Sequence, residues 1–252
     1  ATSWMINNLI RNRGGLHNRL THHLIVKPFS LHECEEYFKT YHFGYSRKQI
    51  AECYMVMGGI PYYLSMMDKS KSLAQNIDQL FFADNAELKD EFSDLYRALF
   101  KKSADHIAVV TTLATKGVGM TRQELVKASG CTDNGAFSTV LEELEQCGFI
   151  RLYEPFSTSY KIASDARQKR NTLYQLVDFY TLFYFRFIKY NKYQDTSFWT
   201  SSQNSQMHHI WAGLSFEMLC LNHIDKIKHA LGISGVQTLV CSWRSNSTEK
   251  GV

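Results

Sequence analysis

The fold of this chain is set by residues 119–154, which read GMTRQELVKASGCTDNGAFSTVLEELEQCGFIRLYE. Thr121 and Glu124 form a T-x-x-E capping box, which predicts a helix that begins there and ends at Gly130. A second amphipathic helix follows the short turn and ends at Gly148. Its predicted inner face consists of Phe137, Val140, Leu141 and Leu144.

The flanking residues extend this pattern on both sides. Upstream, Ile107, Val110 and Leu113 are spaced as one face of a helix. Downstream, residues 149–152 and 173–176 are strand-like and are joined by a polar run. Three short helices and a hairpin predict a winged helix-turn-helix domain over residues 104–178.

The charges of this domain bear on whether it contacts DNA. Its third predicted helix carries four acids and no Lys or Arg between Thr132 and Gly148, and such a helix would be repelled by phosphates. The hairpin tip is basic, and its candidate nucleic-acid-binding residues are Lys161, Arg167, Lys169 and Arg170. A solvated hairpin is the alternative interpretation of these four cations. A winged helix used for packing is favoured over a sequence-specific DNA reader.

Composition sets broad limits. The chain has 252 residues, 44% hydrophobic and 21% charged, with a net charge of +4, which suits one large or a few small globular domains. Its six cysteines form no C-x-x-C motif, so we expect reduced thiols in a cytoplasmic protein. The longest uncharged apolar run, residues 179–185, is too short to span a bilayer, and no membrane partner is expected. Because the first residue is Ala rather than Met, we expect a fragment of a longer protein.

Residues 30–103 predict an all-helical block. Ser30 and Glu33 make a capping box, and Ser46 caps the next helix. The run Gly58-Gly59-Ile60-Pro61 ends that helix, and Pro61 suits the first turn of another. Further helices are expected around residues 73–82 and 85–100.

The order of these motifs resembles a known family. A basic G-L-h-x-R element, Gly15 to Arg19, precedes a predicted strand that ends in Pro28-Phe29. After this strand come the helix capped by Ser30, the run GGIPYYL that begins at Gly58, and the predicted winged helix. This order is similar to the C-terminal two-thirds of the archaeal and bacterial AAA+-related ATPases of the STAND class. The resemblance covers essentially the whole chain. It implies an ATPase-core tail (1–29), a helical lid (30–103), a winged helix (104–178) and the start of a nuclease-like C-terminal domain (179–252).

The resemblance also implies a nucleotide-facing site. Gly59 and Pro61 would lie near the adenine, and Arg19 would sense the γ-phosphate. If the resemblance is set aside, the Gly-Gly pair before Pro61 is explained equally well as a corner between two helices. No G-x-x-x-x-G-K-[ST] phosphate loop occurs in the 252 residues. We therefore expect a full-length relative to bind ATP and magnesium. We expect this chain alone to bind no cofactor and to hydrolyse no ATP. Its main expected partner is the missing N-terminal ATPase core.

The C-terminal part predicts an aromatic core helix over residues 174–193, a long helix over 206–231 and a strand over 236–243. The expected inner stripe of the long helix contains Ile210 or Trp211, Leu214, Met218, Leu221 and Ile224. Residues 213–217 resemble the G-x-x-F-E start of the nuclease-like domain, which makes Glu217 a vestige of that site. We expect Glu217 to be structural, because magnesium needs more than one converging acid, and the strand to be an exposed edge. The histidines show no metal-site spacing.

The sequence thus favours a mainly α protein with a small β component. Its expected fold combines a helical lid, a winged helix-turn-helix and a partial α/β restriction-endonuclease-like domain. The expected function is to couple the nucleotide state of a STAND/AAA+-type protein to a partner or to nucleic acid. The alternatives are a winged-helix DNA-binding transcriptional regulator and a protein-interaction scaffold.

Overall fold

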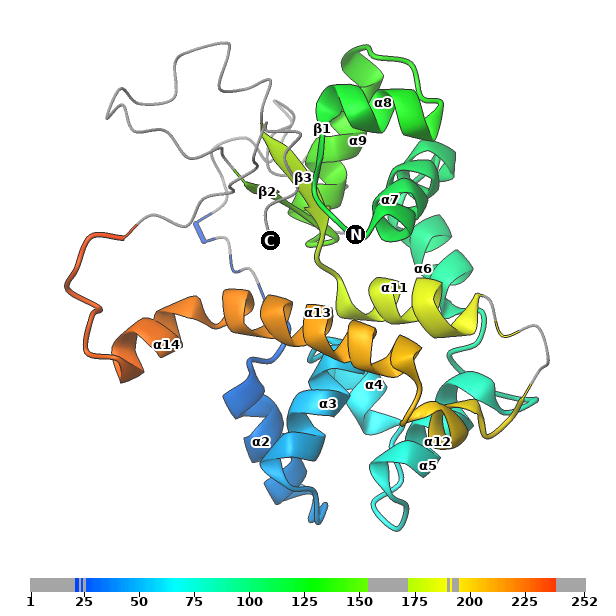
Figure 1. The fold of residues 1–252 in the computed structure, drawn as a ribbon, viewed down its shortest axis with the longest axis vertical. Coiled ribbons are helices and arrows are strands. Elements are labelled where there is room, and N and C mark those ends of the chain that lie inside the picture. The colour runs from blue at the N-terminus through cyan, green and yellow to red at the C-terminus, as the bar shows by residue number, and fades with distance from the viewer. Residues whose placement is uncertain are drawn as a thin grey trace. The chain divides into compact units, whose positions relative to one another are not determined.

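The structure, a computed structural model, describes residues 21, 22, 24, 26–153, 172–189, 191 and 195–238. It is mostly helical with a small antiparallel sheet, which confirms the predicted class of a mainly α protein with a small β component. The chain divides into two compact units (Figure 1). The helical unit comprises Ala1–Ser103 and Asp178–Ser234, and the mixed unit comprises Ala104–Val177 and Gly235–Val252.

The helical unit contains short helices and two π-helical turns, η2 and η3, that each continue an α-helix. Its elements are α2 (Leu31–Thr40), α3 (Arg47–Met57), α4 (Pro61–Ser65), α5 (Leu73–Ile77), η2 (Asp78–Phe82), α6 (Glu91–Leu99), α11 (Phe179–Phe183), η3 (Tyr184–Ile188), α12 (Phe198–Ser202), α13 (Gln206–Asn222) and α14 (Ile224–Ala230). The capping box predicted at Ser30 and the cap predicted at Ser46 are both present, and Ser46 and Ser72 each also form a capping box.

The core of the helical unit is aromatic. Tyr180, Phe183 and Phe187 are buried, as the sequence predicted for its aromatic stretch, although residues 173–176 of that stretch form a strand. The Phe183 ring lies 5.1 Å from the ring of Phe81. Residues between Asp178 and Ser234 therefore complete the core of the helices before Ser103, whereas the resemblance implies a separate domain for residues 179–252.

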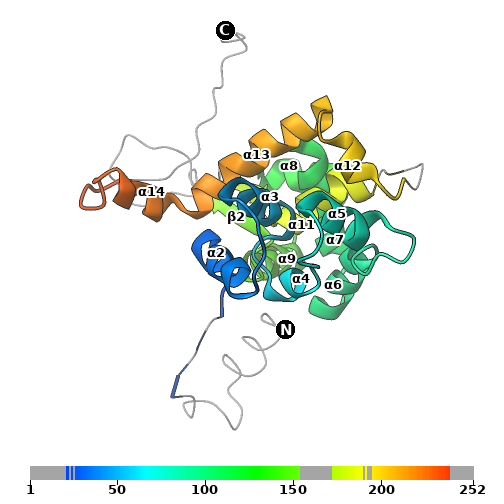
Figure 2. The ribbon, with the colours of Figure 1, turned by 90° about the horizontal axis from the view of Figure 1, so that it is seen from below.

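Helix α13 lies across α3, to which it packs, and both views show this arrangement (Figures 1 and 2). Its buried face consists of Trp211, Ser215, Met218 and Leu219. The predicted inner stripe is correct at Trp211 and Met218 and wrong at Leu214, which is 50% exposed, since Ser215 and Leu219 are the other buried residues of the helix. The helix also ends earlier than predicted, at Asn222, and α14 begins after His223.

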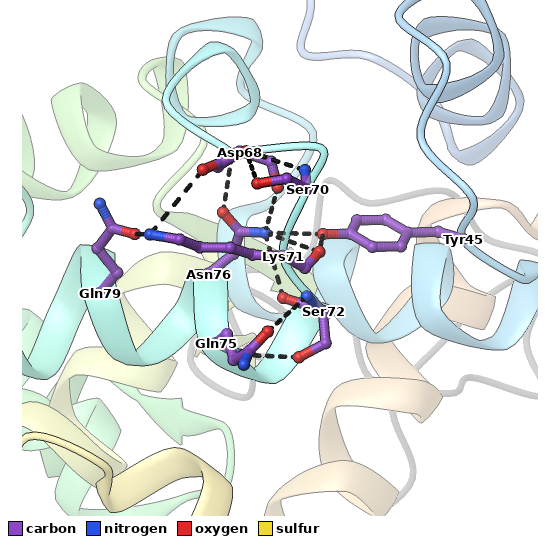
Figure 3. Close-up of polar contacts among 8 residues, drawn as sticks. All are labelled: Tyr45, Asp68, Ser70, Lys71, Ser72, Gln75, Asn76 and Gln79. Atoms are coloured by element: carbon purple, nitrogen blue, oxygen red, sulfur yellow. Dashed lines mark hydrogen bonds and ion pairs between the residues drawn. The ribbon is translucent and has the colours of Figure 1, made fainter.

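A buried amide fixes the loop that leads into α5 (Figure 3). The side chain of Asn76 is buried; its Oδ1 accepts from the Asp68 backbone N–H at 2.7 Å, and its Nδ2 donates to the Asp68 carbonyl at 2.9 Å. Asn76 Nδ2 also donates to the Tyr45 hydroxyl at 2.8 Å, and that hydroxyl donates to the Lys71 carbonyl at 3.1 Å. Because a buried polar group without a partner is costly, this network holds residues 68–72 in one conformation.

The mixed unit contains α7 (Ala104–Lys116), β1 (Met120–Thr121), α8 (Arg122–Ser129), α9 (Gly135–Gln146), β2 (Ile150–Tyr153) and β3 (Leu173–Leu176). The strand order is β1-β3-β2, with both outer strands antiparallel to β3. In the hairpin, Ile150 pairs with Leu176 and Tyr153 with Leu173. The capping box that the sequence predicted at Thr121 and Glu124 is present, and Gly130 ends α8 in the left-handed conformation.

Two predicted strands are not seen in the described residues. Residues 22, 24 and 26 have no regular secondary structure, and neither do residues 237 and 238. Residue 236 lies in a bend, and residues 239–243 of this predicted strand lie outside the described residues, as do residues 23 and 25 of the first predicted strand. Among the described residues, no helix is long and apolar enough to cross a membrane.

Candidate functional site

The candidate site is the corner between α3 and α4, where the sequence predicted nucleotide-facing residues. Gly58 ends α3 with a φ of 69°, and Gly59 follows with a φ of 70°. Ile60 is the N-cap of α4, and Pro61 occupies its first turn, where a missing N–H costs nothing. Two successive left-handed residues therefore redirect the chain from one helix into the next.

The segment that leads into α2 is held against this corner. The Phe29 backbone N–H donates to the Gly59 carbonyl at 2.8 Å. A Cβ at Gly59 would collide with the Phe29 carbonyl oxygen and would lie 2.7 Å from Cε2 of Tyr54. Gly59 is thus required for a close backbone-to-backbone approach as well as for its φ. At Gly58 the nearest atom to an added Cβ is Cβ of Phe179, at an ordinary 3.7 Å.

His223 holds the start of α2 from the opposite end of the sequence. Its Nε2 lies 3.0 Å from the Leu31 backbone nitrogen, which donates to it, and its Nδ1 lies 2.9 Å from the Leu219 carbonyl. These two bonds require the tautomer that carries its proton on Nδ1. The imidazole therefore links the first turn of α2 to the last turn of α13.

Tyr54 packs at the centre of this junction. Its ring meets the His223 ring edge-on at 5.5 Å and the Phe179 ring edge-on at 5.4 Å. Burial raises the pKa of Tyr54 to about 12, so the phenol is neutral at physiological pH. At the other side, hydrogen bonds from Ser30 lower the pKa of Glu33, which keeps the α2 capping box in its ionised form.

We call this set of residues the α2 junction: Phe29, Leu31, Tyr54, Gly59 and His223. It brings together a segment near residue 30, the corner near residue 60 and the end of α13. The junction contains no nucleophile paired with a base. What it can do is transmit displacement of Phe29, because movement of that residue must move the corner or break the Phe29–Gly59 bond.

The predicted nucleotide-facing residues divide into three groups. Gly59 is buried in the junction, whereas Pro61 lies exposed beside Tyr62, which is 62% exposed. Arg19 lies outside the described residues. The exposed Pro61 and Tyr62 offer an apolar and aromatic surface one residue from the buried corner.

The predicted nucleic-acid-binding residues Lys161, Arg167, Lys169 and Arg170 all lie outside the described residues. The acids of the third helix, α9, have two different roles. Glu142 and Glu145 are exposed, whereas Glu143 Oε2 lies 2.9 Å from Nε2 of the buried His106. Only Glu142 and Glu145 therefore contribute free negative charge to the solvent face of α9.

Arg122 contacts residues at the start of α9. The Arg122 guanidinium donates twice to Asp133 Oδ1, at 2.7 and 2.8 Å, and once to the Asn134 carbonyl at 3.2 Å. It also lies 5.0 Å from the centre of the Phe137 ring. Arg122 is thus used to join α8 to α9, and the α9 face that a nucleic acid would meet has no free cation of its own.

Glu217 lies on the solvent face of α13 and is exposed. The structure gives it no hydrogen bond or ion pair with the described residues, so the contacts expected for a structural Glu217 are not seen there. Within the described residues no group of three His, Cys, Asp or Glu side chains could hold a metal ion.

Comparisons with known protein families, with curated proteins and with solved structures found no match.

Sequence reasoning missed Tyr54 and His223 as members of the junction. Tyr54 lies on the buried face of α3, and its position in that helix says nothing about its neighbours in other elements. The contact between His223 and Leu31 spans 192 residues. No local pattern encodes such a pairing, so only a structure or correlated substitutions could have found it.

Proposed function

We propose that this chain is the C-terminal region of a STAND/AAA+-type ATP-binding protein, in which the helical unit responds to nucleotide bound by an upstream core. The observation that supports it best is the α2 junction. A segment that would leave the core at residue 29 is hydrogen-bonded to the Gly-Gly-Ile-Pro corner. The resemblance places Gly59 and Pro61 of this corner near the adenine, and of these two Pro61 is exposed and Gly59 is buried.

The proposal gives the junction a mechanical role. A lid moves as a γ-phosphate is bound or lost, and a rigid link is needed to carry that movement into the helical unit. The Phe29–Gly59 bond fixes the incoming segment to the corner, and His223 fixes the start of α2 to α13. Displacement at residues 26–30 would therefore reach α13 through two hydrogen bonds and the Tyr54 ring.

We further propose that the mixed unit is a winged helix. The element order α7-β1-α8-α9-β2-β3 and the pairing of β1 with β3 support this assignment. Its α9 carries exposed Glu142 and Glu145 and no Lys or Arg, which favours a protein partner over a DNA duplex as the ligand of this helix. The second candidate function is accordingly a protein-interaction scaffold.

The test begins with the natural coding sequence upstream of Ala1. The proposal expects a G-x-x-x-x-G-K-[ST] motif there, because phosphate binding needs backbone N–H groups at a helix start together with a Lys. The protein that includes this segment should bind ATP with magnesium, and the present chain alone should not hydrolyse it. A natural protein without the motif, or one that has it and does not bind ATP, would refute the proposal and leave the scaffold as the better account.

A further inference from the structure

Three ring side chains contact one another where α12 is followed by α13. Trp199 lies on α12, and His208 and Trp211 lie on α13. The centre of the His208 ring is 4.8 Å from that of Trp199 and 5.5 Å from that of Trp211, and the two indole rings are 5.3 Å apart. Trp199 is 0% exposed and Trp211 is 4% exposed, whereas His208 is partly exposed. His208 therefore lies at the edge of a buried tryptophan pair that joins the two helices.

The ring nitrogens of these three side chains have no hydrogen-bond partner. Both nitrogens of His208 and the indole nitrogens of Trp199 and Trp211 are shielded from solvent and unpaired. An unpaired neutral N–H group is costly when buried, but an unpaired buried cation costs far more. Protonated His208 would carry two N–H donors without an acceptor, so its present position suits only the neutral ring.

Within the described residues, the carboxylates beside α12 already accept hydrogen bonds from other groups. Helix α12 itself contains no charged residue. The Asp78 carboxylate accepts from the backbone N–H groups of Trp199 and Thr200. The Asp195 carboxylate accepts from the Ser197 N–H. Neither acid is hydrogen-bonded to the imidazole, so neither balances a charge on it.

The neighbouring basic groups also disfavour a charge on His208. Arg186 and Lys189 are exposed residues of η3, whose Phe187 contacts both indole rings. His209 follows His208 on α13 and is exposed. Burial first, and then the charge of His209, lower the pKa of His208 below its ordinary value. The imidazole is therefore neutral at neutral pH, as its contacts require.

We propose that His208 is a pH-sensitive cover of the Trp199–Trp211 pair. The neutral ring packs against the two indoles. The protonated ring turns away from them so that its N–H groups reach water, and this exposes the tryptophan pair at the corner between α12 and α13. Attraction between a cation and an indole face offsets only part of the lost hydration, because it leaves the N–H groups without acceptors. The device is independent of nucleotide binding.

The direction of the response follows from the lowered pKa. A histidine that has left the tryptophans is half protonated at about pH 6.5, the ordinary value for an imidazole. The packed ring takes up a proton only at lower pH. The packed state is therefore favoured fully above about pH 6.5 and loses that advantage as the pH falls through the lowered pKa. Acidification should uncover the tryptophans, and a return to neutral pH should cover them again.

Acrylamide quenching of tryptophan fluorescence tests the proposal. The chain has four tryptophans, so Trp4→Phe and Trp243→Phe leave Trp199 and Trp211 as the two that report. The quenching constant of this full-length chain should rise severalfold, and reversibly, between about pH 7.5 and pH 5, which brackets the titration of an ordinary imidazole. A constant that stays level or falls over this range would overturn the proposal.

Two further variants make the test specific for His208. His208→Phe keeps a ring against the tryptophans and cannot take up a proton, so quenching should stay low at every pH. His209→Gln is the matched control: it should keep the response and shift its midpoint to higher pH, because the charge of His209 lowers the pKa of His208. A pH response that persists in His208→Phe, or one that is lost in His209→Gln, would contradict the assignment to His208.

Discussion

Gly59→Ala should destabilise the helical unit far more than the same change at the neighbouring glycine. Both glycines have a left-handed backbone, with φ values of 69° and 70°. For an L-residue that conformation costs about 1–2 kcal/mol. Only at Gly59 does the new Cβ collide with the Phe29 carbonyl oxygen and the Tyr54 ring.

The surrounding residues must shift to make room for the added Cβ, and overpacking of this kind costs about 1–3 kcal/mol. Separating the two backbones would also weaken the Phe29 N–H to Gly59 carbonyl bond, which is worth about 0.5–1.5 kcal/mol. Gly59→Ala should therefore lower the free energy of unfolding of the helical unit by about 2.5–6.5 kcal/mol, and Gly58→Ala by about 1–2 kcal/mol. The difference between the two variants isolates the close approach, since the backbone strain is common to both.

Native-state hydrogen exchange is the suitable assay, because a chain with two compact units need not unfold in one transition. Amides of α3 report the stability of the helical unit, and the Phe29 amide reports the junction itself. In Gly59→Ala the Phe29 amide should lose protection, whereas in Gly58→Ala it should keep most of it. Equal losses in the two variants would refute the reasoning, since the collision would then have no energetic effect.

Three further predictions concern other parts of the molecule. Asn76→Leu should destabilise the helical unit by about 3 kcal/mol, because several buried polar groups would lose their hydrogen-bond partner. Tyr45→Phe removes one hydroxyl and should cost only about 1 kcal/mol. Similar losses of stability in the two variants would contradict the network in Figure 3. Glu142→Lys combined with Glu145→Lys should raise the affinity for duplex DNA and steepen its salt dependence by about two phosphate contacts, measured by fluorescence anisotropy; unchanged binding would show that α9 does not face DNA. Burial raises the pKa of Glu52, so the Glu52 carboxyl group holds its proton more tightly in the folded state than in the unfolded state. The stability of the chain therefore falls as the pH rises from the ordinary range of a Glu pKa through the raised pKa. Glu52→Gln should remove that fall and stabilise the chain at neutral pH, and a variant less stable than wild type at neutral pH would show that the charge is well accommodated.

The local features of this fold could be predicted from the sequence because they depend on neighbouring residues. Ser30, Ser46 and Thr121 each cap a helix through a residue three positions later, and each capping box is present. Gly130 ends α8 where a left-handed residue is needed. The two hairpin strands were predicted from the apolar residues within 149–152 and 173–176, which lie within one position of the observed bounds.

The non-local features could not be predicted in the same way. Helix α13 is apolar on two faces, so its periodicity fits more than one stripe. Only tertiary packing, such as that of Trp211 on Phe183 and Trp199, turns Ser215 rather than Leu214 inward. The return of residues 178–234 to the core of the first helices depends on aromatic contacts such as Phe81 with Phe183. The junction depends on His223 and Leu31, which are far apart in sequence. The function assigned to it rests on the resemblance and stays a prediction.

The measurement that tests the proposed coupling most directly is hydrogen exchange at the Phe29 and Leu31 amides in the protein with its natural upstream sequence. These two N–H groups make the bonds that attach the incoming segment to Gly59 and to His223. Exchange is compared with and without a non-hydrolysable ATP analogue and magnesium. The account predicts that nucleotide changes protection at both amides, and that Gly59→Ala abolishes the response while Gly58→Ala retains it. Nucleotide that binds yet leaves both amides unchanged would contradict it.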